Sequence, residues 1–182
     1  MTDDTQPAKW QLGDIHHIGL TVSDLERSIQ FYRDLLGLTL IRQRPHVRED
    51  YISQQTGYEG VELSVASFSS DDIRGRVPAG VLVSGAGSTN GDRPADRRPS
   101  LEIVQYISHA GAPRKPATNR AGSSHLCLLV DDLRACYEDL SNRGVSFKSE
   151  PVTITAGPNE GGLVIYLLDP DGYTIEMFQP PA

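Results

Sequence analysis

One pattern occurs twice in the sequence, and this repeat limits the possible folds more than any other feature. Residues 17–25 read HIGLTVSDL and residues 125–133 read HLCLLVDDL, so His, Leu, Val, Asp and Leu match at one fixed offset. Residues 101–105 (LEIVQ) and 175–179 (IEMFQ) share Glu and Gln between apolar residues. Because both matches occur in the same order, each spanning one half of the chain, the sequence predicts two copies of one module.

Each half predicts the same order of elements, which is a strand, a helix and three further strands. The first strands are expected at residues 15–22 and 124–130, where β-branched and apolar residues alternate with other types. The later strands are expected at residues 38–43, 61–68 and 101–107 in the first half, and at 145–148, 163–168 and 173–178 in the second. Pro45 is expected to end the strand before it, and the DPDG sequence at 169–172 predicts a turn.

Helices are expected directly after the first strand of each half, because apolar residues recur there at helical spacing. Ser23 with Glu26 predicts a capping box for the first helix, and Asp131 is the expected cap of the second. Gly37 and Gly144 stand where a C-terminal glycine ends a helix. A further short helix is expected within residues 47–55.

The predicted fold class is α+β, with two tandem βαβββ modules related by pseudo-two-fold symmetry and forming a curved mixed sheet cup. The expected organisation is an N-terminal extension (1–13), a first module (14–109), a linker (110–121) and a second module (122–182). The first module is longer because of an inserted surface loop at about 71–100, rich in Gly, Pro, Asp and Arg, with a short strand expected at 81–83.

Composition excludes several classes of partner. The net charge is -7, with three lysines beside fourteen arginines, so neither nucleic acid nor an anionic membrane is expected to bind. The apolar runs are far shorter than the roughly 20 residues of a membrane span, and the N-terminus lacks the apolar region of a signal peptide. Cys127 and Cys136 lie in apolar segments and are expected to be reduced thiols of a cytoplasmic protein.

Two histidines and two glutamates stand at repeated positions. Side chains alternate across a strand, so His17 and His125 are expected on the face opposite the apolar residues that pack on the helices. Glu102 and Glu176 lie between apolar neighbours and are expected on that same face. Burying two carboxylates is costly unless a cation meets them, and two imidazoles would complete an N2O2 donor set for a divalent metal.

Other polar residues are less favoured as members of this candidate metal site. His16 competes with His17, but the repeat with His125 favours His17. His46 and His109 have no repeated partner and are expected at the surface. Gln105 and Gln179 repeat on the opposite face from the glutamates, where they are expected to bond neighbouring backbone.

These motifs resemble the vicinal oxygen chelate superfamily, the fold of glyoxalases, bleomycin resistance proteins and extradiol dioxygenases. The matching elements are residues 17–25 with Phe31-Tyr32 and Leu36-Gly37, residues 101–106, residues 125–133 and residues 169–176. The resemblance implies that His17, Glu102, His125 and Glu176 hold one divalent metal, as in glyoxalase I of the bacterial type. Methylmalonyl-CoA epimerase-like members usually carry Gln at the position of Glu102. The Thr and Asn-Trp-Gly stretch that helps glyoxalase I to seat glutathione is absent after Glu102.

By this resemblance the chain is expected to be a metal-dependent isomerase, epimerase or lyase of glyoxalase type. It would stabilise an enediolate or enolate of a small oxygenated substrate and move a proton through Glu102 and Glu176. The metal could be Ni, Co, Zn, Mn or Fe. Tyr106 and Tyr166 are candidate substrate-binding residues, and a homodimer is expected. The alternatives are an extradiol-type Fe(II)/Mn(II) dioxygenase and a non-catalytic, drug-binding protein of the same fold.

Overall fold

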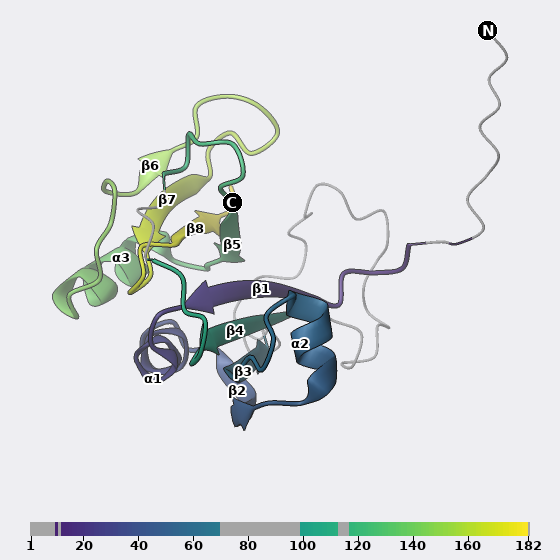
Figure 1. The fold of residues 1–182 in the computed structure, drawn as a ribbon. Helices are drawn as coiled ribbons and strands as arrows, with labels where there is room; N and C mark the ends of the chain where they lie inside the picture. The colour runs from purple at the N-terminus through teal and green to yellow at the C-terminus, as the bar shows by residue number, and fades with distance from the viewer. Residues whose placement is uncertain (1–9, 11, 70–98, 113–116, 182) are drawn as a thin grey trace, which may run out of the picture.

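The computed structural model describes residues 10, 12–69, 99–112 and 117–181, and it contains two four-stranded sheets (Figure 1). The first half consists of β1 (His17–Val22), α1 (Leu25–Ile29), η1 (Gln30–Leu35), β2 (Thr39–Val47), α2 (Asp50–Thr56), β3 (Leu63–Ser69) and β4 (Ser100–Tyr106). The second half consists of β5 (His125–Leu129), α3 (Leu133–Asn142), β6 (Val152–Thr153), β7 (Leu163–Leu168) and β8 (Thr174–Gln179). The insert expected at 71–100, with its strand at 81–83, lies almost entirely outside the described residues.

Both sheets have the same topology, which confirms the predicted pair of βαβββ modules. The strand orders are β1-β4-β3-β2 and β5-β8-β7-β6. In each sheet the first strand pairs in parallel with the last strand, and the remaining pairings are antiparallel. The first strand of each module, β1 or β5, is therefore an edge strand.

Two predicted strand boundaries are wrong. Strand β2 continues through Pro45 to Val47, because the pairing with β3 shifts register between Arg44 and Val47 and a proline is tolerated at such an irregularity. Residues 145–148 do not form a full strand. They make a single antiparallel bridge, Phe147 to Leu167, and the regular pairing with β7 comes later, from β6.

The helix starts differ from the prediction by one residue in each module. The N-cap of α1 is Asp24, whose Oδ1 accepts from the Arg27 amide at 3.0 Å, and the N-cap of α3 is Asp132. Ser23 does not cap, because its hydroxyl donates to Asp171 of the second module and accepts from Arg27. Asp131 instead accepts from the amide of Asp132.

The repeated glutamines hold the first helical amides, as the sequence analysis expected. Gln105 Oε1 accepts from the Leu25 amide at 3.1 Å, while its Nε2 donates to the carbonyl of Ser23 at 3.0 Å. Gln179 Oε1 accepts from the Leu133 amide at 2.8 Å. Each last strand is thereby tied to the helix that follows the neighbouring edge strand.

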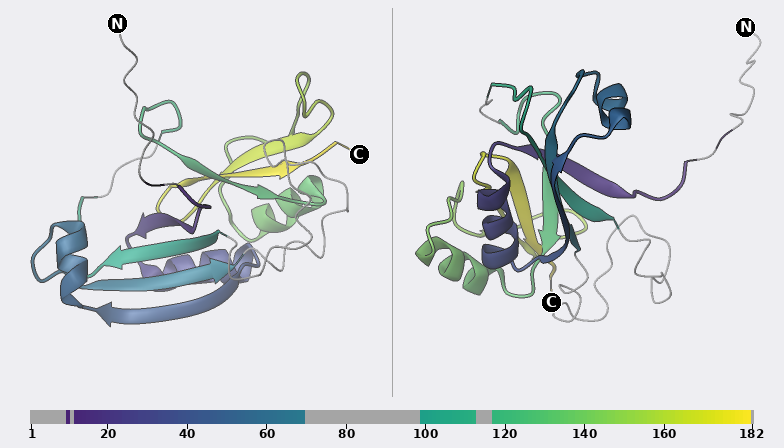
Figure 2. Two further views of the ribbon diagram at one scale, coloured as in Figure 1. Left: turned by 90° about the vertical axis from the view of Figure 1, so that its right-hand side faces the viewer. Right: turned by 60° about the horizontal axis from the view of Figure 1, so that its bottom comes forward.

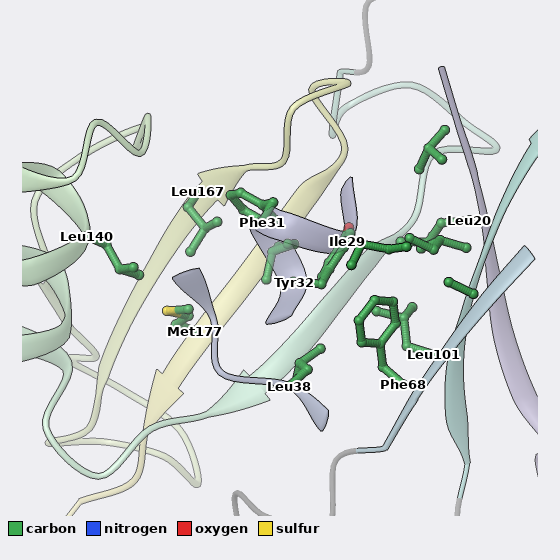
Figure 3. Close-up of a cluster of buried hydrophobic side chains, with 14 of the residues drawn as sticks. Leu20, Ile29, Phe31, Tyr32, Leu38, Phe68, Leu101, Leu140, Leu167 and Met177 are labelled. Carbon is green, nitrogen blue, oxygen red and sulfur yellow. The ribbon is translucent and has the colours of Figure 1, made fainter. Parts of the chain in front are cut away.

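One hydrophobic core joins the two modules (Figure 3). Its fully buried members include Phe68 and Ile103 of the first sheet and Leu167 and Ile175 of the second. Helices α1 and α3 lie side by side in Figure 1 and in the right-hand view of Figure 2, and they contribute Ile29, Leu133 and Leu140 to this core. Because burial of apolar area is the main stabilising contribution, the modules are held together through their helical sides.

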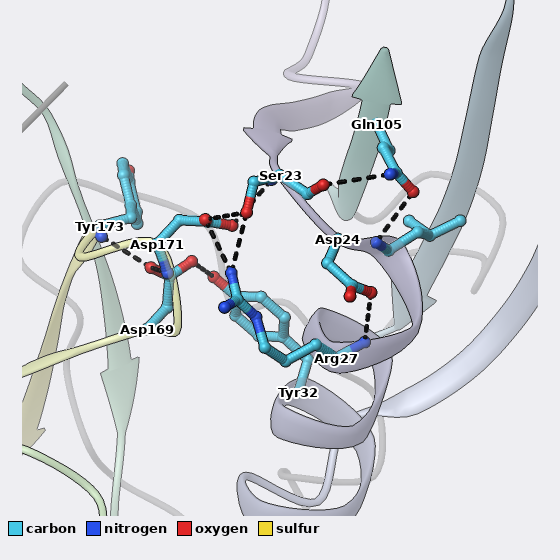
Figure 4. A network of polar contacts seen from close by, with 9 residues as sticks. Ser23, Asp24, Arg27, Tyr32, Gln105, Asp169, Asp171 and Tyr173 are labelled. Atoms are coloured by element: carbon cyan, nitrogen blue, oxygen red, sulfur yellow. Dashed lines mark hydrogen bonds and ion pairs between the residues drawn. The ribbon is translucent and has the colours of Figure 1, made fainter. Parts of the chain in front are cut away.

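A polar network also joins the modules (Figure 4). Asp171, in the β7–β8 turn, accepts from the Ser23 amide at 2.9 Å and from Arg27 at 2.9 Å. The hydroxyl of Tyr32 donates to Asp169 in the same turn at 3.0 Å. The turn itself forms as predicted, with Gly172 donating to the Asp169 carbonyl and adopting φ 81°.

Among the described residues no helix is long and apolar enough to cross a membrane.

The other face of each sheet, turned away from α1 or α3, is called the site face here. In the first sheet it carries His17, Ser67 and Glu102, since their strand neighbours Leu20, Phe68 and Ile103 belong to the core. Helix α2 packs on the far end of this face, where Ile52 forms a second small cluster with Val47, Val61 and Leu63. The site face near His17 and Glu102 is not covered by that cluster.

Candidate active site

The first module brings together His17 and Glu102 from neighbouring parallel strands. Glu102 lies opposite Gly19, whose missing side chain leaves room between the two groups. His17 Nε2 and Glu102 Oε1 are 3.8 Å apart, and the side chains are 42% and 28% exposed. The Nδ1 atoms of His16 and His17 lie 2.8 Å apart, so one ring donates to the other. Because Nδ1 of His17 is engaged in this contact, Nε2 is the ring nitrogen that faces the carboxylate.

The second module repeats this pair with His125 and Glu176. His125 Nε2 and Glu176 Oε2 are 3.0 Å apart, with 43% and 20% of the side chains exposed. Cys127 stands at the position of Gly19, opposite Glu176. Partial burial and then the charge of Glu176 raise the pKa of Cys127 to about 12, so at neutral pH it is a thiol that can donate to the carboxylate.

The two tyrosines singled out by the sequence have different surroundings. Tyr166 lies directly opposite Glu176 in the β7–β8 pair, and its ring centroid is 5.6 Å from that of His125. Partial burial and then the neighbouring Glu176 carboxylate raise the pKa of Tyr166, so its hydroxyl remains a donor at neutral pH. Tyr106 is four residues beyond Glu102 and packs against the cluster under α2. A substrate-binding role for Tyr106 therefore stays a prediction.

The four predicted ligands form two separate pairs in a single chain. No group of three or more His, Cys, Asp or Glu side chains that could hold a metal occurs among the residues for which coordinates are described. The predicted convergence of all four side chains on one point is thus not met within the described residues of one chain, although each module brings one His and one Glu together. The repeat and the strand alternation predicted the His–Glu partner within each module, but not how the two modules are arranged.

The chemistry of each pair suits a borderline divalent metal such as Zn, Ni, Co, Mn or Fe. Each pair offers one imidazole nitrogen and one carboxylate oxygen on an open, partly exposed face. Two such pairs would supply four donors and leave room for substrate oxygens. A single pair provides only two protein ligands, fewer than the three of typical catalytic zinc sites.

His46 and His109 lie outside both pairs, as expected. His46 Nδ1 contacts Glu62 Oε1 at 2.5 Å and its side chain is 66% exposed. His109 is exposed and its ring stacks on Tyr58 at 5.4 Å between centroids. Their backbones have φ values of 56° and 60°. His46 lies within β2, where its pairing with β3 shifts register, and His109 follows the end of β4. Neither histidine contacts a predicted ligand.

Lys148, which no sequence pattern singled out, lies on the site face beside Tyr166. The signal was available in part, because the segment 145–148 was expected to pair with the following strand. Alternation assigns faces only within a regular strand, and residues 145–148 do not form one. The bridge from Phe147 to Leu167 was therefore needed to assign Lys148 to this face.

Tandem βαβββ modules, each with a paired histidine and glutamate on one sheet face, define the class of protein. A profile of the Glyoxalase/Bleomycin resistance protein/Dioxygenase superfamily matches residues 14–177. The chain therefore belongs to that superfamily, as the resemblance in its motifs predicted.

Individual relatives are distant but aligned over most of the chain. A 2-epi-5-epi-valiolone epimerase of Actinomyces sp is 24% identical over 92% of this chain and 80% of its own length. A lactoylglutathione lyase of Haemophilus influenzae is 29% identical over 91% of each chain. The crystal structure of a glyoxalase family protein from Bacillus cereus matches with a TM-score of 0.70 at 17% identity, covering 97% of this chain and all of the other. That structural likeness supports the fold.

Proposed function

We propose that this protein is a metal-dependent lyase, isomerase or epimerase that moves a proton at a carbon next to a carbonyl group. Two relatives are named as a lyase and an epimerase, so the superfamily around this chain includes both outcomes. The observation that carries the proposal is the repeated pair, with an imidazole Nε2 facing a carboxylate oxygen at equivalent positions of both modules.

The proposed metal ligands are His17, Glu102, His125 and Glu176. A divalent cation held by them would act as a Lewis acid and stabilise negative charge on substrate oxygen. The residues of the chain supply the proton transfer, with one glutamate removing the proton and the other returning it from the opposite side. Tyr166 donates towards Glu176 and so helps to position that carboxylate.

We further propose that the site forms between two copies of the chain, the first module of one copy facing the second module of the other. Both pairs lie at sheet edges, since His17 is on β1 and His125 on β5. Large apolar side chains are exposed along and before β1, namely Trp10 (67%), Leu12 (87%), Ile15 (63%) and Ile18 (40%). An exposed edge strand flanked by apolar residues is a typical pairing surface, and a two-fold dimer would create two equal sites.

The substrate of the lactoylglutathione lyases is not carried over to this chain. The Thr and Asn-Trp-Gly stretch associated with glutathione is replaced after Glu102 by Ile103, Val104 and Gln105. Val104 packs beside α2 and Gln105 holds the start of α1, so neither is free to bind a peptide thiol. The proposal is therefore restricted to a small oxygenated carbonyl compound.

Mixing two inactive variants tests both parts of the proposal. His17→Ala and His125→Ala are each expected to lose metal and to stop deuterium wash-in from D2O into a panel of α-hydroxy ketones. In mixed dimers, one site carries both changes and the other carries neither. Random mixing is therefore expected to restore up to about one quarter of the wild-type sites, by the two-fold arrangement of the interface.

The control for this experiment is His109→Ala, an exposed histidine outside the pairs, which should keep full metal content and activity. If mixed dimers form and neither metal nor activity returns, the shared site is wrong. If the protein binds no metal at all by elemental analysis, the enzyme proposal fails and a non-catalytic binder of this fold replaces it. Oxygen consumption with catechols by the Fe(II)-loaded protein would instead indicate the dioxygenase chemistry.

A further inference from the structure

A row of four side chains crosses the site face of the second sheet. Cys127 on β5 lies opposite Glu176 on β8, and Tyr166 on β7 lies opposite Glu176 on its other side. The amide of Lys148 donates to the Tyr166 carbonyl at 2.9 Å, next to the bridge from Phe147 to Leu167. Because Phe147 packs into the core, Lys148 takes the opposite face and completes the row beside Tyr166.

The ammonium group of Lys148 lies over the Tyr166 ring, on the side of the row where His125 is found. Nζ lies 5.4 Å from the centroid of the Tyr166 ring and 3.4 Å from Thr174 Oγ1. Thr174 is the register partner of His125, so the cation lies at the level of the His125–Glu176 pair. A lysine over a tyrosine face is held by a cation–π contact, which limits its otherwise flexible side chain.

Lys148 has no charged partner in the described part of the chain. No carboxylate there comes within the 4.0 Å of an ion pair, although Glu176 belongs to the same row. An exposed lysine usually lies free in solvent, but this one is held against the ring of a tyrosine that also contacts Glu176. Lys148 is exposed, so the remaining donors of its ammonium group are accessible from solvent.

The first module has the same row with a different composition. Gly19 lies opposite Glu102, Ser67 lies opposite Glu102 on the other side, and Arg42 lies opposite Ser67. Each row therefore ends in a cation, Lys148 in one module and Arg42 in the other. The hydroxyl next to the glutamate is Tyr166 in one row and Ser67 in the other, so the duplicated modules keep the charge at this position while the intervening side chain differs.

We propose that Lys148 binds a carboxylate or phosphate group of the substrate, whose reacting carbon lies between the glutamates. The proposal rests on the proposed function, because it assigns a substrate class to the same site. An ammonium group forms strong charge-assisted hydrogen bonds with either anion as a compact point charge. Lys148 is thus a specificity-determining residue, and the preferred substrates are small anionic α-hydroxy carbonyl compounds rather than neutral ones.

The kinetic test compares three probes that differ in charge: dihydroxyacetone, dihydroxyacetone phosphate and hydroxypyruvate. Lys148→Met is expected to lower the ratio of kcat/KM for an anionic probe over that for dihydroxyacetone by about tenfold to a hundredfold, mainly through KM. Lys148→Arg should recover part of the loss. Arg134→Met, which removes an exposed cation on α3, should leave the ratio as it is. The probe that loses most identifies phosphate or carboxylate as the bound group.

A binding test works without turnover, because the chain has only three lysines. Reductive 13C-methylation keeps their charge and gives few signals, and Lys148→Arg assigns the signal of Lys148. Inorganic phosphate or acetate should shift that signal saturably, while the other two lysine signals serve as internal references. Saturation in a protein that exchanges no deuterium would retain the anion site and reject the proposed function.

Two results would overturn the assignment of Lys148. The first is a signal that responds to both anions no more than to chloride at equal ionic strength. The second is an equal loss of kcat/KM for charged and neutral probes in Lys148→Met, which would mean that Lys148 only positions Tyr166.

Discussion

The hydroxyl of Tyr32 donates a 3.0 Å hydrogen bond to Asp169 Oδ2, and both residues are buried where the first helix meets the β7–β8 turn. The other oxygen of Asp169 accepts from the amides of Asp171 and Tyr173 at 2.9 and 2.7 Å. One carboxylate therefore shapes the turn and joins the two modules. Burial outweighs these hydrogen bonds and raises the pKa of Asp169 above its ordinary value of 3.8.

This raised pKa predicts a specific dependence of stability on pH. Between the ordinary and the raised pKa the folded chain binds more protons than the unfolded chain, so the contribution of Asp169 falls as pH rises through this window. In Asp169→Asn that contribution is constant, while the amide oxygen can still accept from the turn. Urea unfolding from about pH 3 to pH 7 should show the wild-type advantage over the variant shrinking with pH. Parallel curves would contradict this account.

Replacing either proposed catalytic glutamate should impair catalysis far more than folding. Glu102→Gln and Glu176→Gln keep the size and one oxygen of the side chain but remove its basicity. Each is expected to slow deuterium wash-in by about 10²- to 10⁴-fold, the usual contribution of a general acid or base, with nearly unchanged urea midpoints. Glu59→Gln, an exposed residue outside both pairs, is the matched control. Full activity in either variant would reduce that glutamate to a structural role.

The two repeated glutamines should stabilise the helix starts to a similar extent. Gln105→Ala and Gln179→Ala each leave one helical amide without its acceptor, and each is expected to lower the free energy of unfolding by about 1 kcal/mol. Replacement by Glu is expected to lower the free energy of unfolding by different amounts at the two positions. Gln179→Glu keeps the oxygen that accepts from the Leu133 amide. Gln105→Glu replaces the Nε2 donor by an oxygen that faces the Ser23 carbonyl, so its loss of stability should be the larger one. A larger loss for Gln179→Glu than for Gln105→Glu would refute this assignment.

Gly162 lies where no side chain fits. A Cβ at this position would be 2.8 Å from the Gln179 carbonyl oxygen and 3.1 Å from that of Asn159. Since both neighbours are backbone atoms, Gly162→Ala is expected to destabilise the fold by about 1–3 kcal/mol in urea unfolding. Gly111→Ala, with open space around the added atom, should change stability by less than about 0.5 kcal/mol. Equal effects of the two changes would show that Gly162 is not sterically constrained.

Much of the fold could be predicted because its signals are local. Alternation along residues 17–22 placed His17 and the core-facing Leu20 on opposite faces, and the helical stripe ended correctly at Gly37 with φ 74°. The predicted caps were wrong by one residue, because Ser23 is recruited by Asp171, a residue far away in the sequence. The prediction that Pro45 ends its strand was wrong for a similar reason, since the irregular pairing of β2 with β3 tolerates a proline.

The amino-acid pattern alone was enough to predict the duplicated module and the sheet face that carries the histidines and glutamates. It also predicted that His17 pairs with Glu102 and His125 with Glu176. These features follow from strand periodicity and from a repeated order of elements, and both can be recognised from residues that are close together in the sequence. The way in which the two modules join depends on their packing in three dimensions. Burial of Ile29, Leu133 and Leu140 in one shared core attaches the modules through their helical sides, and each chain therefore carries two separate His–Glu pairs. Such packing depends on the shapes of whole surfaces, which no local pattern encodes.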